Sequence, residues 1–399
     1  MKHIVLIAAL VAPTFTLANP DPSDWDAVTA EANGQTVYWN AWGGSTTTND
    51  FLAWVGDRVL EDYGVVLEHV KLTDTADAVT RVLSEKQAGE DDDGAIDMIW
   101  INGSNFAAMK DADLLFGPYA EQLPNWAVVD VEGKTVQTDF TVPIEGYESP
   151  WAMAQVVFVQ NTATMPDELG SMEELLEWAQ ANPGRFSYPQ PPDFLGTTFL
   201  KQALVDILDD PSVLQTPATD ENYNEVTAPL WAYLDALTPH LWRMGRAYPA
   251  TGTAMFPLIA DGELDLSISF SPGAASTAIT NFELPDTVRT FVLDKGTIGN
   301  ASFVAIPYNS GSAAGAMVVA NFLMSPEAQA RAQDPNILGY GTVLNMDALS
   351  ADEREAFDAL ELGVATLSPV ELGSVQAEPH PSWMTRIADD WAERYGTGQ

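Results

Sequence analysis

Two short runs in the first third of this 399-residue chain combine aromatic, glycine and small polar residues. An indole ring can stack on a flat or cationic group, and glycine lets backbone N–H groups approach a ligand closely. Hydroxyl and amide side chains add directional hydrogen bonds. This mixture is typical of a small-molecule binding site. The candidates are Trp42, Gly43, Gly44 and Ser45 in the first run, and Asn102, Ser104 and Asn105 in the second.

Later parts of the chain add further candidates of the same kind. A Trp151 face suits a flat or cationic ligand, and the nearby Glu148 carboxylate suits an ammonium group. Each aromatic also has a competing interpretation as a core residue, and Trp151 equally suits the core of a strand that crosses a hinge. Asn102 and Ser104 equally suit the capping of a helix. The further candidates are Glu148, Trp151, Tyr188, Asp193, Phe194, Thr197, Thr198, Ser269, Ser271 and Asn300.

Residues for catalysis or metal binding do not form a recognisable pattern. The chain has no cysteine, which excludes disulfides, thiol nucleophiles and cysteine-based zinc sites. The four histidines lack metal-ligand spacing, and the Gly43-Gly44 turn lacks the lysine of a phosphate-binding loop. Pairs of tyrosines could hold ferric iron, but no spacing selects a pair. The sequence therefore predicts no catalytic residue, no metal site and no cofactor.

The charge of the chain limits its partners. Lys and Arg total 17 against 57 Asp and Glu, for a net charge of −40. Such a surface repels nucleic acid and anionic lipid, so we expect no nucleic-acid partner. The compact acidic run 90–93 could hold a cation, but a solvated loop is the better interpretation. Adaptation to a salty habitat would also explain the total charge.

The beginning of the chain has the pattern of an export signal. Lys2 and His3 are followed by the apolar run 4–12, and small residues end at Ala18. The run is too short to span a bilayer, and the early Pro13 argues against a buried strand. We expect cleavage after Ala18 and export to the periplasm. Without a cysteine at the new N-terminus, no lipid anchor is expected.

Residues 37–115 alternate between strand and helix signals. Short apolar runs at 36–40, 65–67 and 95–101 flank segments with helical spacing at 51–59 and 76–83. This β-α-β-α-β rhythm predicts a largely parallel sheet with helices on both faces. Ligands of such sheets bind beyond the carboxyl ends of the strands. The loops that start at residues 41 and 102 both occupy that edge.

The rest of the chain continues the mixture of strands and helices. The sequence predicts strands near 156–159, 185–188, 262–270, 288–293 and 302–306, and helices at 171–181, 197–208, 224–237, 313–324 and 383–395. No low-complexity linker separates the two halves. A chain of this length without a linker favours two lobes joined by strands that cross a hinge.

At this point several segments together resemble the extracellular solute-binding proteins of ABC importers, in particular the YnjB-type branch. The similarity covers nearly the whole chain after residue 18, and its motifs are specific only in combination. They are AMVVANFLMSPEAQARAQDP from Ala316, WNAWGG from Trp39, KLTDTADAVTRVLSEKQAG from Lys71, IWINGSNF from Ile99, GYESPW from Gly146, YPQPPDFLGTTFLKQ from Tyr188, LPDTVR from Leu284, and TIGN followed by FVAIP from Thr297.

The resemblance implies the α/β type II periplasmic binding fold, with two lobes that close over a ligand. It implies lobe one at 19–150 plus 297–399, and lobe two at 151–296. It also implies a monomer that captures a small-molecule ligand and delivers it to permease subunits in the inner membrane. Two alternatives stay open: a secreted two-lobed hydrolase or lyase, and a periplasmic sensor or ferric-ion carrier. Neither the charge nor the glycine loops decide the chemistry of the ligand.

Overall fold

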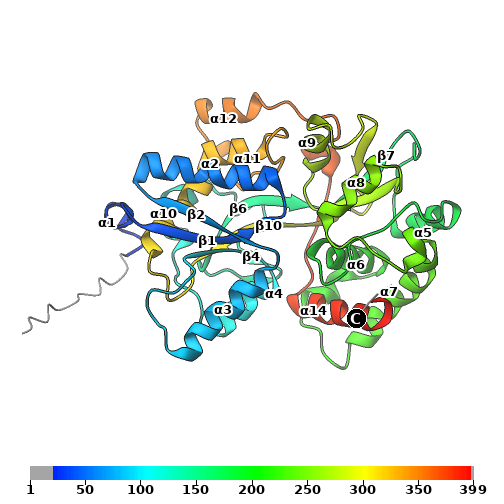
Figure 1. The fold of residues 1–399 in the computed structure, drawn as a ribbon, viewed down its shortest axis with the longest axis horizontal. Helices are drawn as coiled ribbons and strands as arrows, with labels where there is room; N and C mark the ends of the chain where they lie inside the picture. The colour runs from blue at the N-terminus through cyan, green and yellow to red at the C-terminus, as the bar shows by residue number, and fades with distance from the viewer. Residues whose placement is uncertain (1–20, 397–399) are drawn as a thin grey trace, which may run out of the picture.

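A computed structural model describes residues 21–396, which form two lobes side by side (Figure 1). The predicted export signal lies outside the described residues. Buried hydrophobic residues gather in two large clusters, one in each lobe, and in a smaller third cluster. No helix in residues 21–396 has the length and hydropathy needed to cross a membrane.

Lobe one contains a sheet in which three strands are parallel, as the sequence predicts. Strand β1 (Thr36–Trp42) pairs in parallel with β2 (Val66–Leu72) on one side and with β3 (Met98–Ile101) on the other. Strand β10 (Thr297–Ala305) pairs antiparallel with β3 and with β6 (Glu148–Gln155). The short β4 (Thr138–Asp139) and β5 (Val142–Pro143) form a separate hairpin.

Helices cover both faces of this sheet (Figure 1). The ends of these helices follow local signals. In α3 (Thr75–Ala88), the N-cap Asp74 accepts a hydrogen bond from a backbone N–H, and the helix stops at Gly89, which has a positive φ of 75°. Every residue of α10 is buried, because it packs in the centre of the lobe. The helices are α1 (Trp25–Ala32), α2 (Thr46–Tyr63), α3 (Thr75–Ala88), α4 (Ser104–Asp111), α10 (Ala313–Leu323), α11 (Pro326–Gln333) and α12 (Ala351–Asp358).

Lobe two is built on a three-stranded sheet that is wholly antiparallel. Strand β7 (Val157–Asn161) lies between β8 (Leu266–Ser269) and β9 (Val288–Phe291). The strand predicted at 185–188 is wrong, since only an isolated bridge joins Phe186 to Leu266 there. The helices are α5 (Met172–Ala181), α6 (Phe194–Ile207), α7 (Tyr223–Leu237), α8 (Met255–Ala260), α9 (Ala274–Thr280) and α14 (Pro381–Tyr395).

Within residues 21–396, three segments cross between the lobes. β6 runs on into β7, and the turn after β9 leads into β10. The third segment carries α13 (Pro369–Leu372) and β11 (Val375–Gln376), which pairs with the start of β10. Continuous strands at the crossing explain why no flexible linker is visible in the sequence.

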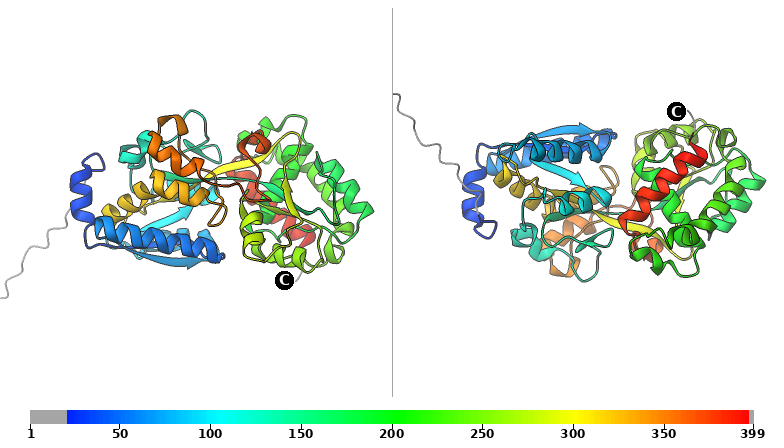
Figure 2. Two further views of the ribbon diagram at one scale, coloured as in Figure 1. Left: turned by 90° about the horizontal axis from the view of Figure 1, so that it is seen from above. Right: turned by 90° about the horizontal axis from the view of Figure 1, so that it is seen from below.

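The C-terminal helix departs from the predicted division of the chain. The family resemblance implies that 297–399 belongs to lobe one, but Trp383, Ile387 and Trp391 on α14 are fully buried in the core of lobe two. Figure 2 shows this helix, in red, lying against the green lobe. Its apolar residues recur at helical spacing, so its amphipathic character is readable. The amphipathic pattern does not say which lobe the helix packs against. The third crossing segment, which precedes α14, carries the chain into lobe two, and α14 packs there. We keep the two-lobe division as a proposal, with α14 moved to lobe two.

Candidate functional site

The carboxyl ends of β1 and β3 lie at the same edge of the sheet in lobe one. The parallel register pairs Asn40 with Ile99, so Trp42 at the end of β1 is level with Ile101 at the end of β3. Trp42 is half-buried, and its indole folds back over Gly44. A Cβ atom on Gly44 would lie 2.5 Å from the indole, so any larger residue there would force the Trp42 ring to move. The glycine lets the Trp42 ring lie over the turn at the carboxyl end of β1, the edge where the sequence predicts a ligand.

Ser45 begins the helix that follows this turn. Its hydroxyl accepts a hydrogen bond from the Thr48 N–H at 3.4 Å and lies 2.8 Å from the Thr47 hydroxyl. The helix N-terminus therefore opens at the same edge as Trp42, which favours a negatively charged or polar ligand group there.

The second run is held to the hinge strand. The Asn102 side chain donates to the Ala301 carbonyl at 2.7 Å and lies 3.4 Å from the Asp139 carboxylate. The Gly103 N–H donates to the same carboxylate at 2.5 Å. Neither Asn102 nor Ser104 caps α4, whose N-cap is Gly103 with a positive φ of 60°. Ser104 and Asn105 are half-buried in the first turn of α4, and their role in binding stays a prediction.

The proposed pairing of Trp151 with Glu148 at a ligand is not supported. Trp151 is fully buried, with its ring 4.8 Å from Trp100 and 6.0 Å from Phe51, so the core interpretation is correct for it. Glu148 is also fully buried, and neither carboxylate oxygen has a hydrogen-bond partner. Burial, with Asp139 nearby, raises the pKa of Glu148 well above its usual value. A buried, neutral carboxyl cannot pair with a ligand cation in the groove.

Three predicted contacts in lobe two are core residues. Tyr188 is fully buried, stacks on Phe199 at 4.3 Å, and its hydroxyl accepts from the Trp391 indole at 3.0 Å. Thr197 and Thr198 are also fully buried, in α6. The Thr198 hydroxyl donates to the Phe194 carbonyl one turn earlier. Helix α6 is therefore enclosed except near its N-terminus.

That N-terminus faces lobe one. Asp193 caps α6 by accepting from the Leu195 and Gly196 N–H groups. The Phe194 ring is 38% exposed and lies 5.4 Å from Phe270 in its own lobe and 6.5 Å from Phe140 in lobe one. These rings meet across the junction of the lobes.

A second contact between the lobes involves the start of α9. The Gly273 N–H donates to the Gly339 carbonyl at 3.2 Å, and the Ser271 hydroxyl to the Leu338 carbonyl at 3.5 Å. Ser269 and Ser271 also bond to each other through one hydroxyl and one N–H group. Both serines therefore have protein partners in this arrangement of the lobes.

Beneath the Phe140 and Phe194 rings lies a buried charged group that sequence reasoning missed. We call Asp139, Lys201, Asn300 and Glu378 the junction cluster. The Lys201 ammonium contacts Glu378 at 2.6 Å, and Asn300 donates to the other Glu378 oxygen at 3.0 Å. Lys201 has no exposed surface, and its ammonium lies 4.4 Å from the centre of the Phe140 ring. Of the cluster, only Asn300 is among the predicted site residues.

The electrostatics of the cluster follow from its burial. Burial raises the pKa of Asp139 to about 8, against the Gly103 N–H group that lowers it. Burial also raises the pKa of Glu378 and lowers that of Lys201, while their mutual contact opposes both shifts. With a 2.6 Å contact and a third partner in Asn300, we treat Lys201 and Glu378 as an ion pair.

One signal for the cluster was present in the sequence. Lys201 interrupts the apolar helix FLGTTFLKQALVDI, where a charge must be either buried or at a functional position. No comparable signal marks Asp139 or Glu378 in a chain with 57 acidic residues.

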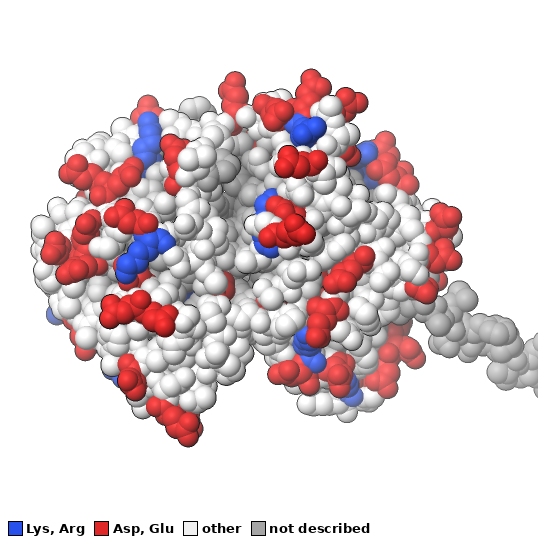
Figure 3. Space-filling model, turned by 180° about the vertical axis from the view of Figure 1, so that it is seen from behind, with Lys and Arg blue, Asp and Glu red and all other residues white. Residues whose placement is uncertain are grey.

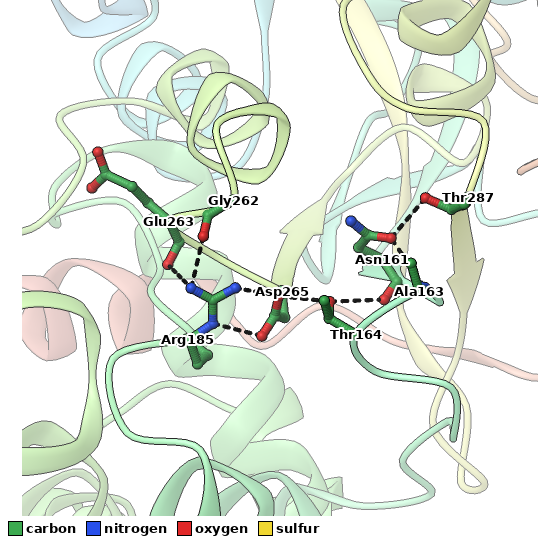
Figure 4. Close-up of polar contacts among 8 residues, drawn as sticks. All are labelled: Asn161, Ala163, Thr164, Arg185, Gly262, Glu263, Asp265 and Thr287. Carbon is green, nitrogen blue, oxygen red and sulfur yellow. Dashed lines mark hydrogen bonds and ion pairs between the residues drawn. The ribbon is translucent and has the colours of Figure 1, made fainter.

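Another polar network lies inside lobe two and serves the fold (Figure 4). Arg185 makes two contacts with Asp265, at 2.6 and 2.5 Å, and donates to the Gly262 carbonyl. The Thr164 hydroxyl donates to Asp265 at 2.6 Å. These bonds join the ends of β7 and β8 to the loop before α6, within one lobe.

The two lobes enclose a groove that is visible in the space-filling view (Figure 3). Acidic side chains are spread over both lobes in that view and do not gather in the groove. Phe194 and Phe270 of lobe two meet Phe140 of lobe one at the junction. The half-buried Trp42, Trp100 and Asn102 lie at or near the carboxyl ends of β1 and β3 in lobe one. The arrangement suits non-covalent binding of a small ligand by aromatic faces and a few polar groups.

Comparison with known families identifies most of the chain. Residues 54–352 match the family model described as bacterial extracellular solute-binding protein. The chain is also 42% identical to Protein YnjB of Escherichia coli (strain K12), and the match covers 100% of both chains.

Solved structures share the fold at low sequence identity. A periplasmic binding protein, AfuA from Actinobacillus pleuropneumoniae with fructose-6-phosphate bound, has a TM-score of 0.64 at 12% identity and covers 91% of this chain and 99% of its own. The spermidine/putrescine ABC transporter substrate-binding protein PotD from Streptococcus pneumoniae has a TM-score of 0.58 at 16% identity, over 90% and 98% of the two chains. The fold is therefore the type II periplasmic binding fold. By its family match and its full-length relative, the chain belongs to the bacterial extracellular solute-binding proteins and serves as the substrate-binding component of an ABC transporter.

Proposed function

We propose that this binding protein captures a small solute in the groove between its lobes, closes over it by a hinge, and delivers it to permease subunits in the inner membrane. In this proposal the chain acts as a monomer in the periplasm, after cleavage behind Ala18, and performs no chemical reaction on the solute. The observation that carries the proposal is that the Phe194 ring of lobe two lies beside the Phe140 ring of lobe one at the groove, with their ring centroids 6.5 Å apart.

Several contacts support the groove as the binding site. On the side of lobe one, Trp42 and the N-terminus of α2 lie at the strand ends where ligands of such sheets bind. On the side of lobe two, Phe194 is the exposed aromatic at the start of α6, beside Phe270. Aromatic faces from two lobes with helix N-termini between them suit a small polar solute that has a flat or apolar part.

The ligand class is open to a direct screen. One structural neighbour has fructose-6-phosphate bound, and another is named as a spermidine/putrescine transporter protein; these compounds carry opposite charges. We would measure the melting temperature with spermidine, putrescine, thiamine, fructose 6-phosphate, inorganic phosphate and ferric citrate. A true ligand raises the melting temperature in proportion to the logarithm of its concentration above Kd. Conversion of the bound compound by the purified chain alone would contradict the proposed receptor role.

The site itself is tested with substitutions on the two lobes. Trp42→Ala and Phe194→Ala should each weaken solute binding at least tenfold in calorimetry, because each removes an aromatic face of the groove. Phe282→Ala is the matched control, since this ring is 96% exposed and touches neither side chain. Unchanged affinity in both groove variants would remove the proposed site.

A further inference from the structure

The junction cluster and its neighbour Glu148 contain one cation and three carboxyl groups. Lys201 forms the ion pair with Glu378, which leaves Asp139 and Glu148 without a buried counter-charge of their own. All four side chains are buried, none more than 4% exposed. An unpaired ionised carboxylate is costly to bury, so it takes up a proton instead. Charge counting therefore makes Asp139 and Glu148 neutral in this arrangement.

The cluster is assembled from both lobes. Asp139 and Phe140 belong to the β4 hairpin of lobe one, whereas Lys201 and Phe194 belong to α6 of lobe two. The Lys201 ammonium lies 4.4 Å from the Phe140 ring centre and 5.4 Å from that of Phe194, so the two rings cover it. Glu378 follows β11 in the third crossing segment. Separating the lobes would pull Asp139 and Phe140 away from Lys201 and admit water.

We propose that Asp139, Lys201 and Glu378 form a proton-linked latch between the lobes: closure buries Asp139 beside the ion pair and takes up one proton from solvent, and opening releases it. This inference rests on the hinge closure in the proposed function. Because Phe194 covers the latch and faces the groove, the latch couples the occupancy of the groove to the pH of the periplasm.

The direction of the pH effect follows from Asp139. Its pKa is about 8 when it is buried, and hydration on opening returns it toward the ordinary value of 3.8. The closed form therefore binds one more proton than the open form between these two values. Closure is favoured as the pH falls through this window, by up to tenfold in the closed-to-open ratio per pH unit. Above the closed-state pKa the ratio becomes constant.

Other charged groups lie near Asp139, and their contributions to the pH effect must be distinguished from that of Asp139. The negative charge of Glu378 raises the pKa of Asp139, and the positive charge of Lys201 lowers it. Asp139 also raises the pKa of Glu148 on β6, which Lys110 on α4 lowers. The Asn102 amide and the Gly103 N–H are the neutral donors from the β3–α4 turn. His380, two residues beyond Glu378, has an ordinary pKa of 6.5, which lies within the pH range between the two pKa values of Asp139, and burial lowers it. Its contribution persists when Asp139 is replaced, which separates the two groups.

The absence of cysteine makes a distance measurement direct. Spin labels on Asp57→Cys in α2 and Glu177→Cys in α5 report the separation of the lobes, since both residues are exposed. In the otherwise native chain without added solute, we expect the short-distance population to rise from pH 9 to pH 6. The same labels in Asp139→Asn should lose most of this rise, because asparagine keeps an acceptor for Gly103 but does not titrate; any rise that remains belongs to other groups such as His380.

The matched control is Asp77→Asn, which removes an exposed carboxylate from the same lobe. It should keep the native pH dependence. The latch would be overturned if the short-distance population depended on pH equally in Asp139→Asn and in the native chain. It would also be overturned if this population in the native chain did not depend on pH at all, a result that does not require the variant to fold. A label distance that responds to a solute from the melting screen but not to pH contradicts only the latch. A distance fixed under pH and under every such solute contradicts hinge closure itself.

Discussion

Two ion pairs in this protein use similar residues in different surroundings. Inside lobe two, the Arg185 guanidinium donates to both carboxylate oxygens of Asp265, and the Thr164 hydroxyl donates a third hydrogen bond to the same carboxylate (Figure 4). Burial alone would raise the pKa of Asp265, but these donors outweigh it and lower the pKa. Between the lobes, Lys201 and Glu378 share their site with Asp139, whose pKa burial raises to about 8.

The difference lies in the ratio of cations to carboxyl groups and in access to water. Arg185 is 33% exposed and balances one carboxylate, so that pair stays charged over a wide range of pH and fixes the loop. The junction cluster has one buried cation for more than one carboxyl group, so its charge depends on pH. A balanced pair suits a permanent joint within a lobe, whereas an unbalanced cluster suits a contact that opens and closes.

The largest effect is expected from Lys201→Met. Removing the ammonium leaves Glu378 buried without its cation, which costs about 3–5 kcal/mol of unfolding free energy at pH 7. Denaturant unfolding measures the loss, and Lys71→Met, at an exposed position, is the control. The double variant Lys201→Met with Glu378→Gln should regain most of it. A loss no larger than that of the control would show that the pair is not buried as described.

Asp139→Asn should change how stability depends on pH. The folded-state pKa of about 8 lies above the unfolded value of 3.8, so ionising Asp139 destabilises the native fold as pH rises through this range. The variant should match the native chain near pH 4 and exceed it at pH 8. The gain is limited to about 2–3 kcal/mol, because opening the lobes hydrates the carboxyl and relieves the penalty. Melting curves across this range provide the test, and a variant less stable at pH 8 would contradict the assignment.

The opposite sign is expected for Asp265→Asn. The native pKa is lowered below 3.8, so the stabilisation by Arg185 is complete above the unfolded pKa and is lost as pH falls through the folded pKa. We expect a loss of about 1.5–3 kcal/mol at pH 7. This loss should shrink as the pH falls below 3.8 and through the lowered folded-state pKa. Asp261→Asn on the exposed neighbouring turn is the control. A difference that persists undiminished in acid would mean that packing, not charge, explains the loss.

The smallest effect is expected from Thr164→Val. This change removes one hydrogen bond to Asp265 and keeps the shape of the side chain. The expected cost is about 0.5–1.5 kcal/mol in denaturant unfolding, since Arg185 still satisfies the carboxylate. Thr280→Val, at the exposed end of α9, serves for comparison. An effect as large as that of Asp265→Asn would show that Thr164, and not Arg185, is the main partner.

Much of the fold was readable from local patterns. The parallel β-α-β-α-β part of lobe one and the helices predicted near 171–181 and 313–324 are confirmed. These features depend on side-chain period and on residues within one turn, which a sequence displays directly. The lobe that α14 joins was not readable, because an amphipathic face indicates burial but not the partner.

The candidate site divides in the same way. The ligand edge at Trp42 and the exposed Phe194 at the start of α6 follow from strand ends and helix starts. Trp151 and Tyr188 have the same residue types but are fully buried, because aromatic identity does not say which face of an element a ring occupies.

The sequence by itself determined most of the element types and the family, and it predicts the edge of the sheet where a ligand would bind. Only the tertiary structure brought Lys201 to Glu378, 177 positions later in the chain, and placed Asp139 beside them. Their unusual pKa values arise from burial and from the ratio of charges in one small volume. Both are properties of three-dimensional packing, and no local pattern in a chain rich in acidic residues encodes them.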